Sequence, residues 1–225
     1  GCYHGDTMGA ASLAAGKGIF FSRFRGFGME VTHVRNMDDL RAMPQEFLDT
    51  VAGIVIEPII QGVNRMTPWP KGMLRELREF CTQQGIYLIC DEVMTGFGRT
   101  GKLFACMNEG VIPDFLCCAK GLTSGYTPMA ACFTTEEVYN KFLGTYSENK
   151  SFYYGHSFTA HPIGCAAAMA SLDVFENEQV LENLPPKIAL IGELAEHLKQ
   201  SNPHVTAVRQ VGMILGIDIA RADGT

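Results

Sequence analysis

The chain has 225 residues, of which 47% are hydrophobic and 19% are charged, so it can bury a large core and wholesale disorder is excluded. Its 18 basic residues stand against 24 acidic ones, for a net charge of −6. This balance offers no basic surface for a nucleic acid. No apolar run reaches the roughly 18 residues of a membrane span, so we expect neither nucleic acid nor a membrane as a partner.

The eight cysteines contain no Cys-x-x-Cys pair. Cys90, Cys117, Cys118 and Cys132 lie inside apolar runs, where a free cysteine packs as a small hydrophobic side chain. This pattern argues against a secreted disulfide framework and favours a reducing cytoplasm. The spacing of zinc ligands is also absent, so no metal site is predicted.

Short apolar runs alternate with helical patterns along the chain. We expect strands at 53–58, 86–90, 115–119, 129–133, 205–211 and 213–219, and helices at about 71–84, 134–143, 162–175 and 186–200. A capping box of Thr134 and Glu137 is expected to begin the second helix. The run at 86–90 lacks polar alternation, which is typical of a parallel strand covered on both faces. The order of elements predicts an α/β fold with a mostly parallel sheet.

Two carboxylates, Asp91 and Glu92, follow directly on the expected strand at 86–90. Ligands of parallel α/β sheets bind outside the carboxyl ends of the strands. One interpretation is therefore an acid directed at a bound ligand. The alternative is an ordinary loop acid or helix cap.

Lys120 follows the next expected strand and precedes a glycine. A lysine that is desolvated at such a position has a lowered pKa and is a candidate for Schiff-base chemistry. Taken alone, it could equally be a surface lysine at the end of a strand.

Together, Asp91 and Lys120 suggest pyridoxal phosphate as the cofactor. The lysine would form a Schiff base with the cofactor, and the acid would pair with the pyridinium nitrogen so that the ring can accept electrons. A nicotinamide-dependent oxidoreductase is disfavoured, because no Gly-x-Gly-x-x-Gly follows an early strand.

Three segments carry a specific resemblance to a known family. They are Leu-Ile-Cys-Asp-Glu-Val-Met-Thr-Gly-Phe-Gly-Arg-Thr-Gly at 88–101, Ala-Lys-Gly-Leu at 119–122 and Gly-His-Ser-Phe at 155–158. The chain resembles the class III aminotransferases of pyridoxal-phosphate fold type I, over essentially its whole length. This resemblance implies a large cofactor domain at 1–178 that lacks its N-terminal part, followed by the beginning of a smaller α/β C-terminal domain at 179–225. The chain is therefore expected to be a fragment of a longer protein.

Further segments resemble the branch of this family that serves biotin synthesis, namely 102–106, 129–131 and 134–136. That branch converts 8-amino-7-oxononanoate to 7,8-diaminononanoate, with adenosylmethionine or lysine as the amino donor. Met94 stands where ornithine and 4-aminobutyrate members of the class usually carry glutamine, which favours the biotin branch. The alternatives are another class III transaminase that uses ω-amino acids or amines with pyruvate, and an inactive fragment that keeps the fold.

The resemblance also implies roles for individual residues. Lys120 would bind the cofactor, contact the substrate and transfer the proton, and Asp91 would be the catalytic partner of the pyridinium nitrogen. Val93 would press on the cofactor ring, although plain core packing explains it equally well. Tyr3 would stack on the other face of the ring and contact the substrate.

The remaining implied site residues lie in two other segments. Gly155, His156 and Ser157 would form a loop that reaches the cofactor phosphate of a neighbouring subunit, with Gly155 also at the substrate, so a homodimer with shared sites is implied. The alternative for His156 is an ordinary loop histidine. Glu57 would lie at the substrate site and pair with an arginine beyond residue 225, or else be a structural acid at a strand end. The expected small-molecule partners are an amino donor and a keto acceptor.

Overall fold

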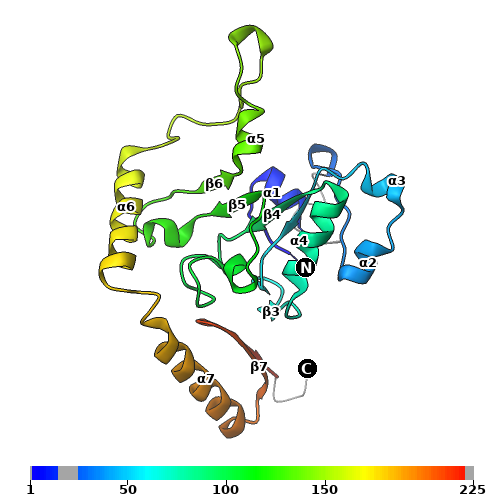
Figure 1. Cartoon of the computed structure of the whole chain (residues 1–225). Helices are drawn as coiled ribbons and strands as arrows, with labels where there is room; N and C mark the ends of the chain where they lie inside the picture. The colour runs from blue at the N-terminus through cyan, green and yellow to red at the C-terminus, as the bar shows by residue number, and fades with distance from the viewer. Residues whose placement is uncertain (1, 15–24, 221–225) are drawn as a thin grey trace.

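The computed structural model describes residues 2–14 and 25–220. Four strands form the central sheet in the order β1-β4-β5-β6; they are β1 (Gly53–Ile56), β4 (Tyr87–Asp91), β5 (Phe115–Cys118) and β6 (Ala131–Thr134). The first three run parallel, and β6 runs antiparallel to β5. The predicted α/β fold with a mostly parallel sheet is confirmed (Figure 1).

Helix α4 (Met73–Gln84) covers one face of this sheet. Its apolar side chains recur with helical spacing, and Leu74 and Cys81 are almost completely buried against Leu88 of β4. Complete burial of one such aliphatic side chain contributes about 1.5–3 kcal/mol. The helix ends at Gly85, whose φ of 68° is the left-handed conformation that glycine adopts without strain.

Short elements fill the connections around the sheet. The helices among them are α1 (Met8–Ser12), α2 (Met37–Arg41), α3 (Gln45–Leu48) and the single turns η1 (Arg25–Phe27), η2 (Ala105–Glu109), η3 (Lys120–Thr123) and η4 (Tyr146–Glu148). A two-stranded ribbon, β2 (Ile60–Gln61) with β3 (Thr67–Pro68), follows β1.

The prediction that Thr134 is the N-cap of the next helix is wrong by one residue. Thr134 is the last residue of β6, paired with Phe115, and its hydroxyl donates to the carbonyl of Asp114 at 3.0 Å. The N-cap is instead Thr135, whose hydroxyl accepts from the N–H of Val138. Helix α5 therefore spans Glu136–Asn140 and ends earlier than predicted.

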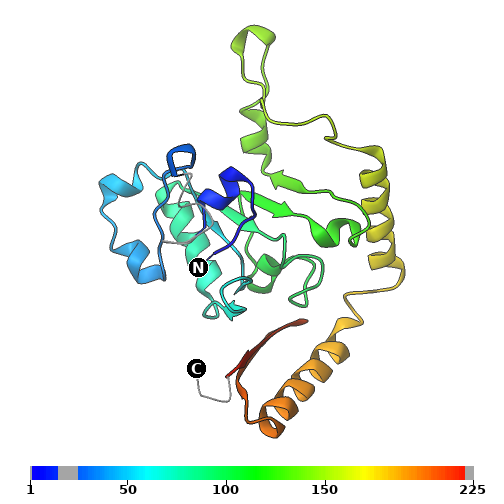
Figure 2. The same ribbon diagram turned by 180° about the vertical axis from the view of Figure 1, so that it is seen from behind.

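The C-terminal part of the described chain begins with a helix at residues 162–177 that packs against η3, and then continues into a separate layer. Helices α6 (Pro162–Asn177) and α7 (Leu184–Ser201) lead to an antiparallel hairpin of β7 (Val205–Val211) and β8 (Ile214–Ile219), and α7 packs on β7. Figures 1 and 2 show α7 and the hairpin beyond the end of the central sheet.

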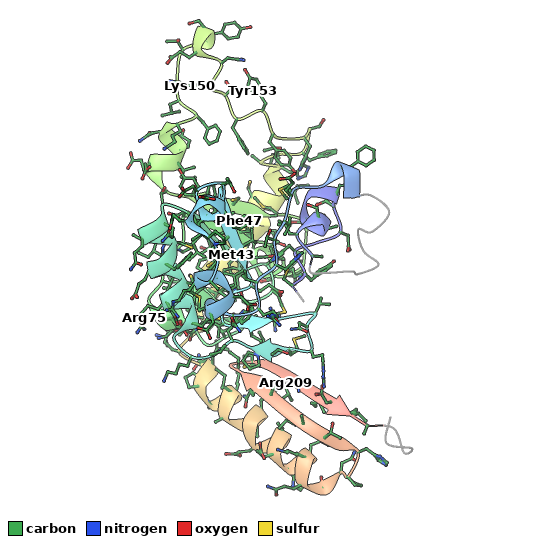
Figure 3. The ribbon with its side chains drawn as sticks, turned by 90° about the vertical axis from the view of Figure 1, so that its right-hand side faces the viewer. Met43, Phe47, Arg75, Lys150, Tyr153 and Arg209 are labelled. Carbon is green, nitrogen blue, oxygen red and sulfur yellow. The ribbon has the colours of Figure 1, made fainter. Side chains whose placement is uncertain are left out.

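A charged contact joins the hairpin to the rest of the molecule. Arg209 donates two hydrogen bonds of 2.7 Å to Asp218 and a third to the carbonyl of Arg65, which lies between β2 and β3. Arg65 also pairs with Asp218. Figure 3 shows Arg209 on the side of the hairpin that faces the central part of the molecule.

Over the described ranges 2–14 and 25–220, no helix combines the length and apolarity required to cross a bilayer.

Candidate active site

Asp91 is the last residue of β4, at the carboxyl end of a central parallel strand. Its Oδ1 accepts the N–H of Val93 at 3.0 Å, and its Oδ2 lies 2.7 Å from Nδ1 of His4. The side chain is only 12% exposed. The predicted acid is thus held in a fixed orientation by two donors.

His4 is a site residue that sequence reasoning missed. Its side chain is 4% exposed; burial disfavours the charged imidazole, but hydrogen bonds with Asp91 and Cys2 outweigh burial and raise the pKa of His4 to about 9. Nδ1–H therefore donates to Asp91 from a positively charged ring at neutral pH. The other nitrogen, Nε2, is buried and has no hydrogen-bond partner among the described residues.

Lys120 begins η3, immediately beyond the end of β5. Its φ of 47° lies in the left-handed region, which is uncommon for a residue other than glycine. The next residue, Gly121, packs so closely on Phe97 that an added Cβ would lie 2.7 Å from the Phe97 Cβ. Non-glycine residues in such conformations persist where surrounding packing enforces them, and they cluster at functional sites.

The Lys120 side chain is exposed, and no hydrogen bond or ion pair engages its ammonium within the described part of the chain. Asp91 pairs with Cys117 in the register of β4 and β5, and the N–H of Glu92 donates to the Cys117 carbonyl at 2.8 Å. The acid and the lysine therefore stand at the same edge of the sheet, on neighbouring strands.

Glu57 connects the N-terminal segment to the sheet. Its carboxylate is 5% exposed and accepts the N–H of Tyr3 at 3.1 Å and the N–H of Gly62 at 2.8 Å. Burial raises the pKa of this carboxyl group, and the two N–H donors oppose that change. Through this carboxylate, Tyr3 and its neighbour His4 are held beside Asp91.

Glu92, the second acid of the pair, has a different environment. It is completely buried and accepts hydrogen bonds from the Thr95 hydroxyl and from the N–H groups of Ala105 and Cys106. The carboxylate thereby closes the loop that follows β4. Val93, which follows the two acids in the chain, is partly buried, and this burial is compatible with both roles considered for it.

Gly155, His156 and Ser157 lie in an exposed segment between α5 and α6. The N–H of His156 donates to the Thr159 hydroxyl, and the ring of His156 accepts from the N–H of Phe158, so this segment forms a local turn. Figure 1 shows the chain between α5 and α6 projecting from the body, and Figure 3 places Lys150 and Tyr153 near its tip. No hydrogen bond among the described residues joins 155–157 to Asp91, Lys120 or Glu57.

A cavity of about 920 Å³ opens on the β1 side of the sheet. His4 and Glu57 contribute to its wall, together with Met43 and Phe47, which Figure 3 labels. Asp91 and Lys120 do not line it. The cavity therefore reaches His4 and Glu57 but neither the acid Asp91 nor Lys120.

The residues present fit pyridoxal phosphate on chemical grounds. Lys120 supplies a primary amine that has no partner among residues 2–14 and 25–220 and can condense with an aldehyde. Asp91 is a carboxylate whose oxygens keep lone pairs beyond their contacts with His4 and Val93, so it can accept from a protonated ring nitrogen. Among the described residues, no group of three or more His, Cys, Asp or Glu side chains is arranged to hold a metal ion.

Residues 1–224 match the family model described as Aminotransferase class-III. The chain belongs to this family. Among similar proteins, the adenosylmethionine-8-amino-7-oxononanoate aminotransferase of Geobacter sulfurreducens is 41% identical over 99% of this chain and 53% of the relative. The class-III resemblance of the sequence motifs is therefore confirmed.

Solved structures of class-III relatives share this fold. The crystal structure of adenosylmethionine-8-amino-7-oxononanoate aminotransferase from Methanocaldococcus jannaschii superposes with a TM-score of 0.90 at 38% identity, over 98% of this chain and 52% of that one. Taurine:2-oxoglutarate aminotransferase from Bifidobacterium kashiwanohense, solved in complex with PLP and glutamate, gives 0.83 at 26% identity, over 97% of this chain and 53% of that one. The chain spans about half the length of the relatives it matches.

Proposed function

We propose that the protein is a pyridoxal-phosphate-dependent aminotransferase that converts 8-amino-7-oxononanoate to 7,8-diaminononanoate in biotin synthesis. The observation that carries the chemistry is the pairing of Asp91 with His4 at the sheet edge where Lys120 also stands, with its ammonium unpaired in the part of the chain that the structure describes. Support for the substrate comes from relatives that bear the name of this enzyme at 41% and 38% identity.

Pyridoxal phosphate, when bound, supplies an aldehyde and a ring that withdraws electrons from the reacting carbon. Lys120 would hold the cofactor covalently through Nζ and, once released by the substrate, would accept and return a proton at Nζ. Asp91 would face the ring nitrogen with the carboxylate that His4 and the Val93 N–H orient. Tyr3, fixed through its N–H by Glu57, would lie against the ring and the substrate.

The test uses the full-length protein with pyridoxal phosphate and compares Lys120→Ala with the wild type. Borohydride reduction should attach the cofactor covalently to Lys120 of the wild type, recovered in tryptic peptide 103–141 because trypsin does not cleave after the modified lysine. The variant should show neither this attachment nor transamination. Lys102→Ala, which changes another exposed lysine, is the matched control and should behave as wild type. Covalent trapping and turnover in Lys120→Ala would refute the assignment.

The substrate is tested separately, by supplying 8-amino-7-oxononanoate or pyruvate as the amino acceptor with adenosylmethionine, lysine and simple amines as donors. We expect turnover with 8-amino-7-oxononanoate. Turnover with pyruvate and ω-amino compounds alone would favour the other class-III reaction, while leaving the role of Lys120 intact.

We further propose that the enzyme is a cytoplasmic homodimer in which residues 155–157 reach the site of the neighbouring subunit, and that residue 178 ends the large domain. Support for the dimer comes from the projecting segment, whose aromatic residues Tyr146, Phe152, Tyr153 and Tyr154 are at least 65% exposed. Support for the compartment comes from the eight cysteines, all of which are free. Sedimentation of the full-length protein, with and without Tyr153→Ser, tests the dimer.

A further inference from the structure

Cys117 and Cys132 face each other across the antiparallel pair of β5 and β6. They are direct partners in the register, and their sulfur atoms lie 3.8 Å apart. Directly opposed residues of antiparallel strands have Cα atoms about 4.5–5.5 Å apart, which falls within the range of about 4.4–6.8 Å that a disulfide spans. A bond between these sulfurs therefore requires rotation of two side chains and no movement of the strands.

The two thiols differ in access. Cys132 is exposed and Cys117 is partly buried, so the expectation that both pack as core residues is wrong for Cys132. Within the described residues, β6 is exposed along most of its length. The other two cysteines that the sequence placed in apolar runs, Cys90 of β4 and Cys118 of β5, are buried as expected.

The contact between the two thiols also shifts their pKa values in opposite directions. The Cys117 thiol donates to the Cys132 sulfur, and this hydrogen bond lowers the pKa of Cys132 to about 7, against the opposing effect of burial. The same contact, together with burial, raises the pKa of Cys117. Redox-sensing cysteines typically combine an exposed thiol of lowered pKa with a second thiol next to it. Cys132 and Cys117 have this arrangement.

We infer that Cys117 and Cys132 form a redox-active dithiol that exchanges with low-molecular-weight disulfides such as oxidised glutathione, with Cys132 as the attacking and Cys117 as the resolving residue. This inference does not depend on the proposed transamination. It concerns a modification site on the strand beside Asp91, because Cys117 is also the register partner of Asp91 in β4.

The exchange proceeds in two balanced steps. The Cys132 thiolate attacks one sulfur of the small disulfide, which forms a mixed disulfide and expels one small thiolate. Cys117 then loses its proton, attacks the Cys132 sulfur and expels the second small thiolate. The two protein thiols are oxidised by two electrons, the small disulfide is reduced by two electrons, and the two thiol protons end on the two small thiols.

The experiment equilibrates the native full chain with mixtures of reduced and oxidised glutathione, blocks free thiols with N-ethylmaleimide and maps the tryptic peptides. Peptide 121–141 contains Cys132 as its only cysteine, whereas peptide 103–120 contains Cys106, Cys117 and Cys118. We expect a linked pair of these peptides that fragmentation assigns to Cys117, and that excess dithiothreitol removes. Complete blocking of Cys132 by maleimide after every oxidising mixture, with no linked pair, would overturn the inference.

Serine variants separate the two roles. In Cys117→Ser, glutathione should remain attached to Cys132, because no resolving thiol is present. In Cys132→Ser, glutathione at Cys117 should fall at least tenfold below that level, and the linked pair should be absent. Equal glutathione attachment in the two variants, or a preference for Cys117, would contradict the assigned roles.

Cys165→Ser is the matched control, since Cys165 is partly buried on α6 and belongs to no thiol pair in the described structure. This variant should form the Cys117–Cys132 link as wild type does. Circular dichroism melting confirms that each variant is folded, and the wild-type mapping alone decides the inference if a serine variant fails to fold.

Discussion

Nδ1 of His4 lies 2.7 Å from Oδ2 of Asp91, although 87 residues separate the two in the chain. The imidazole approaches the carboxylate from the N-terminal segment, and Glu57 fixes that segment through the N–H of Tyr3. A buried acid thus acquires a positively charged neighbour. This relationship links the stability of the fold to the charge state of the candidate site.

The His4–Asp91 pair makes stability dependent on pH. The pKa of His4 is about 9 in the folded chain against 6.5 for an ordinary histidine, so folding retains a proton that the unfolded chain releases between these values. The stabilisation is fully present below about pH 6.5 and is lost as the pH rises to about 9. A shift of this size corresponds to on the order of 3 kcal/mol.

Urea unfolding at pH 6 and pH 9 measures this loss. His4→Gln should lack the contribution of His4 to the free energy of unfolding at pH 6. The difference in this free energy between wild type and variant should therefore narrow toward pH 9. His197→Gln removes an exposed histidine of α7 and should leave the wild-type dependence. An unchanged gap between wild type and His4→Gln across this range would contradict the prediction.

Asp91→Asn should reduce turnover of the full-length enzyme about 100-fold or more, because a neutral amide no longer stabilises a protonated ring nitrogen. The variant keeps the size of the side chain and one oxygen to accept from His4, so it should remain folded. Single-turnover rates measure the effect, and Asp38→Asn, an exposed acid of α2, is the control. A rate within threefold of wild type would remove Asp91 from the catalytic role.

Glu57→Gln should loosen the N-terminal segment. Each carboxylate oxygen accepts one backbone N–H, from Tyr3 and from Gly62, and an amide would direct N–H groups at one of these donors. Loss of one buried hydrogen bond costs about 1–3 kcal/mol. Hydrogen exchange of the Tyr3 amide should accelerate at least fivefold, while the amides of β4 keep their protection; equal acceleration in β4 would indicate general destabilisation instead.

The sequence predicted the strand ends at Asp91 and Lys120 because apolar runs followed by polar residues report burial directly. It did not predict His4 as a partner of Asp91, since a contact between residues so distant in the chain depends on tertiary folding. The triplet Tyr-His-Gly at 3–5 offered one signal, a histidine beside a residue already expected at the cofactor. The resemblance assigned Tyr3 but did not extend to its neighbour.

Glu92 and Cys132 show a second limit of the sequence. Asp91 and Glu92 are equivalent as adjacent acids at a strand end, yet alternation of side chains and the following turn direct Glu92 into the loop, where it meets two backbone N–H groups. Cys132 lies in an apolar run like Cys118, but in the described part of the chain β6 is mostly uncovered and Cys132 is exposed. Both outcomes depend on which elements cover a strand, which hydrophobic pattern alone does not specify.

Glu92→Ala should destabilise the fold by about 3 kcal/mol or more, because it leaves the N–H groups of Ala105 and Cys106 and the Thr95 hydroxyl buried without an acceptor. Thr95→Val removes one of these donors and should cost only about 1 kcal/mol. Chemical unfolding measures both changes. Since Glu92 contacts the loop and not the site edge, turnover per folded molecule should stay within about threefold of wild type; a large loss of turnover at unchanged stability would instead assign Glu92 to catalysis.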